Sequence, residues 1–269
     1  MNFTRIARAI RKASRSGEVL LCRREMKHWL RVTGAYVGVR GIPYPHEIRL
    51  RSGLSFVLEE PYDLDTFWQI FFHRVYAVLP EDRFIVDVGA NIGLFSCYAA
   101  SSNRHRRVFA LEPFPATFRR LEQSIERNRL ESRVSARQAA VSDNTGIAKM
   151  TVGNLPSQMA RIVDESGDGA LHDVPTLSLA DCLEASGFAS IDLLKIDIEG
   201  SEFRVLETAP PECLERVRRI SVEYHCPLAE PRGSWQQLVR YLDRAGFKPL
   251  QTDRLHPSYD VLHLVRSTS

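Results

Sequence analysis

A glycine-rich turn beside an acidic residue is the part of this sequence best suited to holding a small ligand. The stretch DVGANIG runs from Asp87 to Gly93 and follows an apolar run that begins at Phe84. A buried strand that breaks into such a turn and opens a helix lets the backbone approach a ligand closely, because glycine has no Cβ. The residues that we expect to contact a nucleotide-like ligand are Asp87, Gly89, Asn91 and Gly93.

The spacing of this turn indicates which ligand it binds. D-x-G-x-N-x-G differs from the G-x-G-x-x-G of dinucleotide enzymes and from the G-x-x-x-x-G-K-[ST] of phosphate-binding loops. It carries an acidic residue and no lysine, so it suits a cationic ligand without phosphate. S-adenosylmethionine, which has a sulfonium, an ammonium and a ribose diol, is such a ligand and is the cofactor that we expect.

A second acidic residue fits the same ligand. Glu112 follows an apolar segment and lies 19 residues after Gly93. A carboxylate at this place can accept both ribose hydroxyls of a bound nucleoside. The alternative is a carboxylate that only stabilises the start of the helix after Pro113. Because Glu112 occurs together with the glycine turn at Asp87, we favour the ribose interpretation.

Charged residues also interrupt the apolar stretch LLKIDIEGSE. Lys195 and Asp197 are two apart on one expected strand, so they point to the same face. Buried charges are costly unless they are paired, which makes a role in packing alone a poor explanation. Glu199 and Glu202 crowd the junction that follows, where they either join the site or only complement a helix N-terminus.

Glu223 and His225 share one face at the end of the next expected strand. His225 is a candidate general base, because imidazole titrates near neutral pH, or an ordinary histidine at a strand end. Asp197, Glu223 and His225 could also bind a divalent metal through oxygen and imidazole ligands. Because no D-x-D or H-x-x-x-H spacing supports that alternative, we do not expect a metal.

The elements that must position these residues alternate between strands and helices. Strands are expected over residues 108–113, 134–141, 148–152, 191–197, 219–224, 247–251 and 261–265. Helices are expected over residues 94–101, 116–130, 178–185, 201–208 and 234–245. This order predicts an α/β fold with a mostly parallel sheet, helices on both faces and a final antiparallel strand pair. The acidic residues then lie at the carboxyl ends of strands, where such sheets bind ligands.

The remaining segments suggest an extension and one long loop. Residues 47–59 alternate around Ser52-Gly53, which predicts a β-hairpin, and residues 64–79 are expected to form a helix. Residues 153–175 lack clear periodicity and are expected to be a long loop of the kind that can act as a lid. We therefore divide the chain into an extension, residues 1–80, and a cofactor-binding domain, residues 81–269.

Composition limits the class of protein. Hydrophobic residues make up 44% and charged residues 26% of the 269 positions, as in an ordinary soluble protein. No apolar run reaches the roughly 18 residues that span a bilayer, and no signal peptide is recognisable, so we expect a cytoplasmic location. Five widely spaced cysteines without a C-x-x-C pair argue against disulfides and structural zinc.

The basic charge is concentrated at the N-terminus. Residues 1–30 hold eight Lys or Arg and two Glu, whereas the remainder carries a net charge of −3. Residues 2–15 and about 18–31 are expected to be helical, the first with a small apolar face. They either contact a membrane surface or another anionic partner, or form a basic cap packed on the main domain, which is the interpretation we favour.

Four motifs occur in the order DVGANIGLFS, LEPFP, AAVSD and LLKIDIEGSE. With them the sequence resembles the FkbM family of S-adenosylmethionine-dependent methyltransferases, over about Phe84 to Val265. The resemblance implies the Rossmann-like class I methyltransferase fold with a seven-stranded sheet. It implies O-methylation, because family members methylate hydroxyls of sugars and polyketide-type metabolites. Besides the contacts already named, it implies adenine packing near Phe114, Ala140 and Ser142.

The mechanism that we expect is direct in-line transfer to a hydroxyl of a small molecule or glycan. Asp197 or His225 would take the hydroxyl proton, and Lys195 would pair with Asp197 or Glu223. Methylation of a nucleic acid is an alternative that only the basic N-terminus supports; the acidic body and the absence of a D/N-P-P-Y motif oppose it. A non-catalytic cofactor-binding protein is a second alternative, against which the retained charged residues argue.

Overall fold

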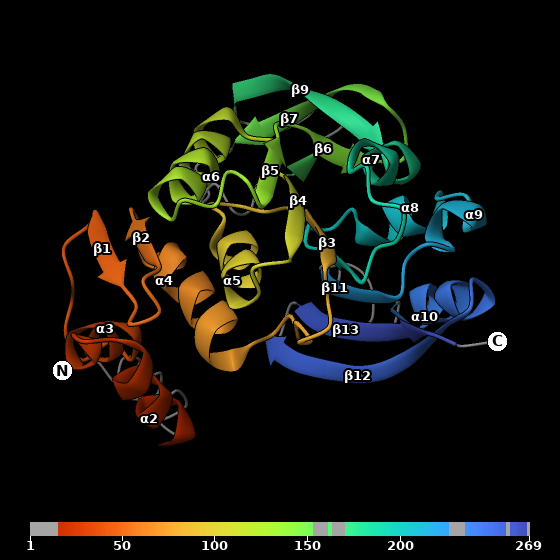
Figure 1. Cartoon of the computed structure of the whole chain (residues 1–269). Helices are drawn as coiled ribbons and strands as arrows, with labels where there is room; N and C mark the ends of the chain where they lie inside the picture. Colours follow the sequence, from red (N-terminus) through yellow and green to blue (C-terminus); the bar gives the residue numbers. More distant parts are fainter. Residues whose placement is uncertain (1–15, 153–160, 163–169, 226–234, 257–258, 268–269) are drawn as a thin grey trace.

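The computed structural model describes residues 16–152, 161–162, 170–225, 235–256 and 259–267. Its centre is a seven-stranded sheet (Figure 1). In spatial order the strands are β12 (Phe247–His256), β13 (Tyr259–Arg266), β11 (Arg219–His225), β10 (Leu193–Ile196), β3 (Phe84–Val88), β4 (Arg107–Leu111) and β5 (Val134–Arg137). The five strands from β11 to β5 are parallel, and β13 runs antiparallel to both of its neighbours. The predicted sheet and its final antiparallel pair are confirmed.

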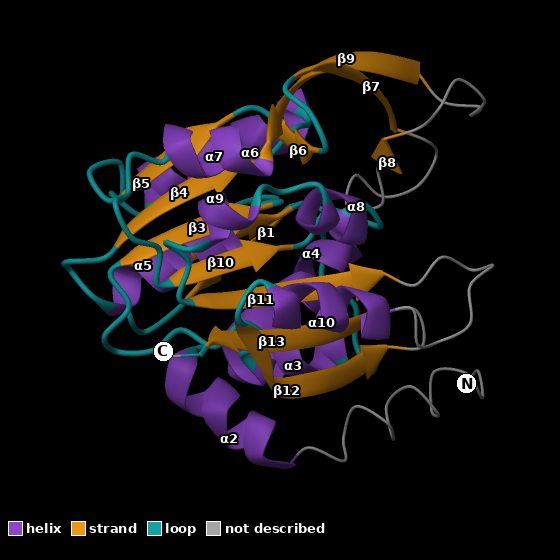
Figure 2. Cartoon of the chain, turned by 90° about the vertical axis from the view of Figure 1, so that its right-hand side faces the viewer, coloured by secondary structure: helices purple, strands orange, loops and turns teal. Residues whose placement is uncertain are grey.

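Helices cover both faces of this sheet (Figures 1 and 2). On one face, α5 (Leu94–Ser102) and α6 (Pro115–Arg127) share a hydrophobic cluster with Ile85 and Leu193. On the other face lie α7 (Leu179–Ala185), α8 (Glu202–Glu207), α9 (Pro211–Leu214) and α10 (Trp235–Arg244). Alternation along the buried strands sends successive side chains to opposite faces, so β3, β4 and β10 contribute to both clusters. The start of α7 is as predicted, because the Ser178 side chain accepts from the N–H of Asp181.

The N-terminal extension packs against the same sheet. It contains α2 (Ser16–Glu25), α3 (Trp29–Tyr36), the hairpin β1 (His46–Arg49) and β2 (Ser55–Leu58), α4 (Pro61–Trp68) and the π-helix η1 (Gln69–His73). Most of its aromatic residues are buried; the Tyr36 and Trp68 rings stack with centroids 3.9 Å apart. The side chain of Asn128 holds the hairpin by accepting from the N–H of Ser55 and donating to its carbonyl. Extension and sheet therefore share one hydrophobic cluster.

Three segments differ from the sequence-based expectations. The helix expected over residues 64–79 begins at Pro61 and ends at His73, because Arg74 adopts a left-handed conformation with φ 53°. The helical segment expected over residues 18–31 is divided between α2 and α3. The strand expected over residues 134–141 is also divided: β5 joins the large sheet, and β6 (Ala140–Ser142) joins another. The helix expected over residues 2–15 lies outside the described residues.

The expectation of one long loop over residues 153–175 is wrong in part. Strands β8 (Arg161–Ile162) and β9 (Ala170–Ser178) fall within or overlap this range and form a four-stranded sheet with β6 and β7 (Gly146–Val152). The physical reason is cross-strand pairing: β9 pairs with all seven residues of β7, although His172, Asp173 and Pro175 hide its strand character. This second sheet lies next to the β4–β5 edge of the large sheet (Figures 1 and 2).

Strand β11 carries polar side chains on one of its faces. Its residues Arg219, Ser221, Glu223 and His225 alternate with apolar residues, and all are buried. The segment between η1 and β3 covers this face: Arg219 forms an ion pair with the fully buried Asp82 and donates to the carbonyl of Ala77. No helix in the described part of the chain is long and apolar enough to cross a membrane.

This buried ion pair should matter for stability. Replacing Arg219 with Met leaves the Asp82 carboxylate buried without its cation, so we expect a loss of about 3–5 kcal/mol in the free energy of unfolding. Arg218 is a matched control, because its exposed guanidinium lies 3.2 Å from exposed Glu81 and only 3.7 Å from Asp192, and its replacement should cost about 1 kcal/mol or less. Denaturant unfolding of both variants measures the difference; equal losses would contradict the role of the pair.

Candidate active site

The glycine turn runs directly over the carboxyl end of β10. Gly89 has φ +78°, and a Cβ on it would lie 1.8 Å from the carbonyl oxygen of Asp197. Asn91 also adopts a left-handed conformation, with φ 50°. Gly93 has φ +83°, and a Cβ there would lie 2.6 Å from Leu121 Cδ1. Both glycines therefore serve close packing of the turn as well as its left-handed backbone.

A buried lysine joins this turn to the neighbouring strand end. Lys195 Nζ lies 3.1 Å from Asp87 Oδ1 and donates to the carbonyl of Gly89 at 2.7 Å. The other oxygen of Asp87 accepts from the Ser96 hydroxyl of α5 at 2.5 Å. Burial lowers the pKa of Lys195, but the carboxylates of Asp87 and Asp197 outweigh it and leave the pKa raised. The lysine is therefore a permanent cation.

Glu112 lies on the other side of the turn. Its Oε2 accepts from the N–H of Asn91 at 3.0 Å, and its Oε1 accepts from the N–H of Phe114 at 3.1 Å. Burial raises the pKa of Glu112 to about 7, although these two hydrogen bonds and Lys195 oppose the shift. Phe114 and Ala140 belong to one small buried cluster, and partly buried Ser142 follows Ala140 at the end of β6.

Four of the predicted residues meet at the ends of β10 and β11, together with a tyrosine that the sequence did not indicate. The Tyr76 hydroxyl lies 2.6 Å from Glu223 Oε2 and 3.2 Å from Asp197 Oδ2, and donates to these oxygens. Lys195 Nζ lies 3.6 Å from Asp197 Oδ2 and 5.2 Å from the centroid of the Tyr76 ring. Burial and the two carboxylates raise the pKa of Tyr76 well above its ordinary value, so it remains a phenol.

His225 completes this cluster. Its Nδ1 lies 2.8 Å from Glu202 Oε1, and its Nε2 lies 3.4 Å from Glu199 Oε2 and 3.5 Å from Glu223 Oε1. Burial alone would lower the pKa of His225, but the hydrogen bond and charge of Glu202, with the nearby carboxylates, raise it to about 10. Burial and the charge of Asp197 raise the pKa of Glu223 as well.

The acidic residues of the following turn have a structural role too. Glu202 Oε1 also accepts from the N–H of Gly200 at 2.9 Å and of Ile198 at 3.3 Å. Glu202 therefore orders both the turn and the His225 ring. The interpretation as a carboxylate that complements the start of α8 is compatible with this arrangement, but it does not account for the contact with His225.

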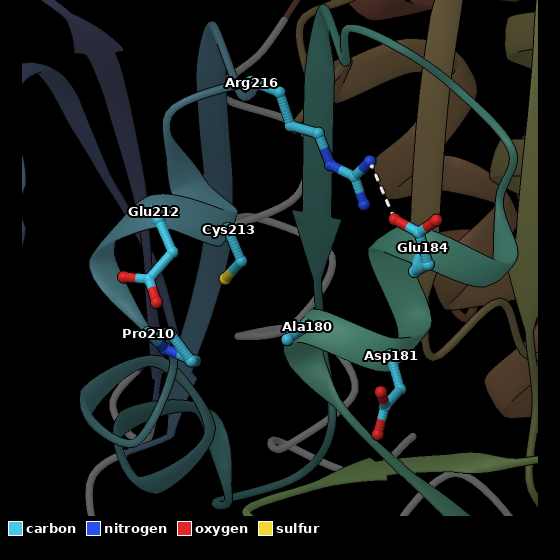
Figure 3. Close-up of a pocket in the computed structure, with 7 residues that line it drawn as sticks. All are labelled: Ala180, Asp181, Glu184, Pro210, Glu212, Cys213 and Arg216. Atoms are coloured by element: carbon cyan, nitrogen blue, oxygen red, sulfur yellow. Dashed lines mark hydrogen bonds and ion pairs between the residues drawn. The ribbon is translucent and has the colours of Figure 1, made fainter.

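The structure also has a surface pocket away from these residues, between α7 and α9 (Figure 3). The residues that line it are Ala180, Asp181, Glu184, Pro210, Glu212, Cys213 and Arg216. Arg216 pairs with Glu184 across it at 3.4 Å. None of the predicted site residues lines this pocket, so it is not the site that the sequence motifs indicate.

Comparisons with known proteins match this description. The family model described as the methyltransferase FkbM domain matches residues 87–249. Methyltransferase sdnD of Sordaria araneosa is 32% identical over 210 residues, which are 66% of this chain and 80% of that protein. The 31-O-demethyl-FK506 methyltransferase FkbM of Streptomyces tacrolimicus is 32% identical over 192 residues, 61% of this chain and 72% of that protein.

A more distant relative and one solved structure extend the comparison. The hexuronic acid methyltransferase AglP of Haloferax volcanii is 28% identical over 145 residues, 54% of this chain and 57% of that protein. The crystal structure of an FkbM methyltransferase from Methylobacillus flagellatus shares the fold, with a TM-score of 0.51 at 13% identity over 96% of this chain and 60% of that one. This chain therefore belongs to the FkbM methyltransferase family.

Proposed function

We propose that the chain is an S-adenosylmethionine-dependent O-methyltransferase that acts on a hydroxyl of a sugar, glycolipid or polyketide-type small molecule. The observation that carries this proposal is Lys195, which contacts the glycine turn through Asp87 and the carboxylate cluster through Asp197. Lys195 thereby makes the proposed cofactor site at the glycine turn a neighbour of the proposed proton acceptor, Asp197. The names of two relatives support a hydroxyl acceptor, since one is a 31-O-demethyl-FK506 methyltransferase and another a hexuronic acid methyltransferase.

The residues around the turn fit the cofactor. Each oxygen of Glu112 accepts one backbone N–H and keeps a further lone pair for a ribose hydroxyl. The cluster of Phe114 and Ala140 offers an apolar surface for adenine, and Ser142 follows it. The carboxylates nearby suit a cationic ligand. When bound, the cofactor supplies an already activated methyl group on its sulfonium.

The chain has to orient the acceptor hydroxyl and take its proton. We assign the proton to Asp197, because its side chain is 27% exposed whereas those of Glu223 and His225 are 8% and 10% exposed. Both ring nitrogens of His225 face carboxylates, so His225 acts as a positioning residue whose ring is held by the hydrogen bond between Nδ1 and Glu202. In its assigned role, the Asp197 carboxylate takes the proton of the acceptor hydroxyl.

Lys195 and Tyr76 prepare Asp197 for this step. Both approach the same oxygen, Oδ2, which holds the carboxylate in one orientation before the acceptor arrives. Hydrogen bonds to a carboxylate also stabilise its charged form. Tyr76 is therefore a positioning residue, although it belongs to the segment before the matched family region.

Cofactor binding is the first test. In titration calorimetry with S-adenosylmethionine and S-adenosylhomocysteine, we expect the wild-type chain to bind both, and Asp87→Ala and Glu112→Ala to bind neither measurably. Glu184→Ala is the matched control, because this 83% exposed carboxylate lies in the separate pocket and its loss should change nothing. Absence of binding by folded wild-type protein would overturn the proposal.

The raised pKa of Glu112 makes cofactor binding depend on pH. Only the ionised carboxylate can accept from both ribose hydroxyls, and its pKa lies at about 7. Affinity for S-adenosylhomocysteine should therefore fall as pH drops through 7, approaching about tenfold per pH unit on the acid side. Glu112→Gln should bind S-adenosylhomocysteine more weakly than the wild type. Its affinity should also vary less between about pH 6 and about pH 8, one unit on each side of the Glu112 pKa. Equal pH dependence in both proteins would exclude Glu112 as the titrating group.

Replacing Tyr76 with Phe tests the positioning role. Loss of a hydrogen bond to a charged group costs about 1.5–3 kcal/mol, so kcat should fall about 10–100-fold while KM for the acceptor and cofactor affinity stay nearly unchanged. The measurement is transfer of labelled methyl to an acceptor found by screening sugars and polyketides. Tyr62→Phe, at a tyrosine that is 45% exposed, is the control. An unchanged kcat for Tyr76→Phe would refute the role.

A further inference from the structure

We infer that Asp197, Glu223 and His225 form a binding site for a hard divalent cation, Mg²⁺ or Mn²⁺. Each of them offers one ligand atom, and these atoms all lie within 4.8 Å of one another. The ligands come from the ends of two neighbouring strands, β10 and β11. Spacing motifs such as D-x-D describe ligands within one segment, which is why the sequence named these three residues as possible metal ligands without favouring a metal.

The His225 ring is held as metal-binding histidines are held. Its Nδ1 lies 2.8 Å from Glu202 Oε1, and Nε2 lies on the side of Glu223 Oε1 at 3.5 Å. A ligating histidine commonly gives one ring nitrogen to the metal and donates the other N–H to a carboxylate. Glu202 is itself fixed by the N–H of Gly200, so the ring is oriented before any ion arrives.

The two carboxylate ligands are oriented in the same way. Tyr76 donates to Glu223 Oε2 and Asp197 Oδ2, and Lys195 approaches the same Asp197 oxygen. Glu223 thereby turns its other oxygen, Oε1, toward His225. Donors behind each ligand are the usual second layer of a protein metal site, and here they come from Tyr76 and Lys195.

Acidic groups are concentrated around the site. Four carboxylates gather there: Asp197, Glu199, Glu202 and Glu223. His225 pairs with Glu199, Glu202 and Glu223, and Lys195 pairs with Asp197 and with Asp87. The Oε2 atom of Glu202 is buried with no hydrogen-bond partner in the described part of the chain. A divalent cation would interact favourably with these carboxylates.

The donor atoms select the kind of ion and acceptor. Carboxylate oxygens with a single imidazole suit Mg²⁺ and Mn²⁺ better than softer metals. The role of the ion rests on the proposed function: beside the acceptor it would lower the pKa of the hydroxyl, while Asp197 would bind the ion through one lone pair and accept the hydroxyl proton through another. It would also favour acceptors with two adjacent oxygens, such as a vicinal diol or a hydroxy-ketone, because both can approach one ion.

Binding of Mn²⁺ to metal-free purified protein, followed by electron paramagnetic resonance, tests the site directly. We expect about one ion per chain with half-saturation below about 1 mM. His225→Gln and Glu223→Gln should each weaken binding at least tenfold, and Asp197→Asn is a third variant if one of these fails to fold. Glu184→Gln, in the separate pocket, should bind Mn²⁺ like the wild type. S-adenosylhomocysteine binding and thermal unfolding of each variant check that the fold and cofactor site are intact.

Three outcomes would overturn the inference while leaving the proposed function in place. The first is a chain that binds S-adenosylhomocysteine but no Mn²⁺ at millimolar concentration. The second is equal Mn²⁺ affinity in His225→Gln and wild type, which would locate the ion elsewhere. The third is competitive displacement of Mn²⁺ by S-adenosylhomocysteine, which would mean that the carboxylates hold the cofactor's ammonium. Loss of cofactor binding by wild-type protein would instead count against the proposed function.

Discussion

The buried ion pair of Lys195 with Asp87 is the interaction on which the rest of the site depends. Removing a lysine ammonium from water costs several kcal/mol unless partners replace the water. Here those partners are Asp87, the carbonyl of Gly89 and, at 3.6 Å, Asp197. Because they belong to β3, the glycine turn and the end of β10, satisfying one ammonium fixes three pieces of backbone relative to one another. The small distance between Gly89 and the Asp197 carbonyl is part of the same arrangement.

A second constraint is the polar face of β11, which needs polar partners to be buried. The segment between η1 and β3 supplies them, since Asp82 meets Arg219 and Tyr76 meets Glu223. The segment between η1 and β3 is therefore more than a cover for apolar surface. It brings the Tyr76 hydroxyl into the candidate active site and balances the charge of Arg219 at the start of the same strand. Changes in this segment would be transmitted to the site through Tyr76.

Much of the fold follows from local sequence pattern. The apolar run at Phe84, the glycine turn and the Ser178 helix start are encoded by residues close together in the chain, so the sequence predicted them. Tyr76 carries no such signal, because its partners lie 121 and 147 residues away. The same holds for β9, whose strand conformation depends on pairing with β7 rather than on its own apolar pattern. The closeness of Asp197, Glu223 and His225 likewise depends on the pairing of β10 with β11, so the sequence offered these residues as metal ligands only as an alternative that was not favoured.

The energetic cost of the carboxylate cluster argues that chemistry, rather than packing, explains it. Burial raises the pKa values of Glu112 and Glu223. A carboxyl group whose folded pKa exceeds its unfolded value binds its proton more tightly in the folded state, so stability falls as pH rises from the unfolded pKa toward the folded one. At neutral pH these groups therefore oppose folding. The opposite face of β11 shows that the strand can be packed with Ile220 and Val222. Strongly perturbed acids gathered at the carboxyl ends of strands are instead typical of sites that bind cations or move protons.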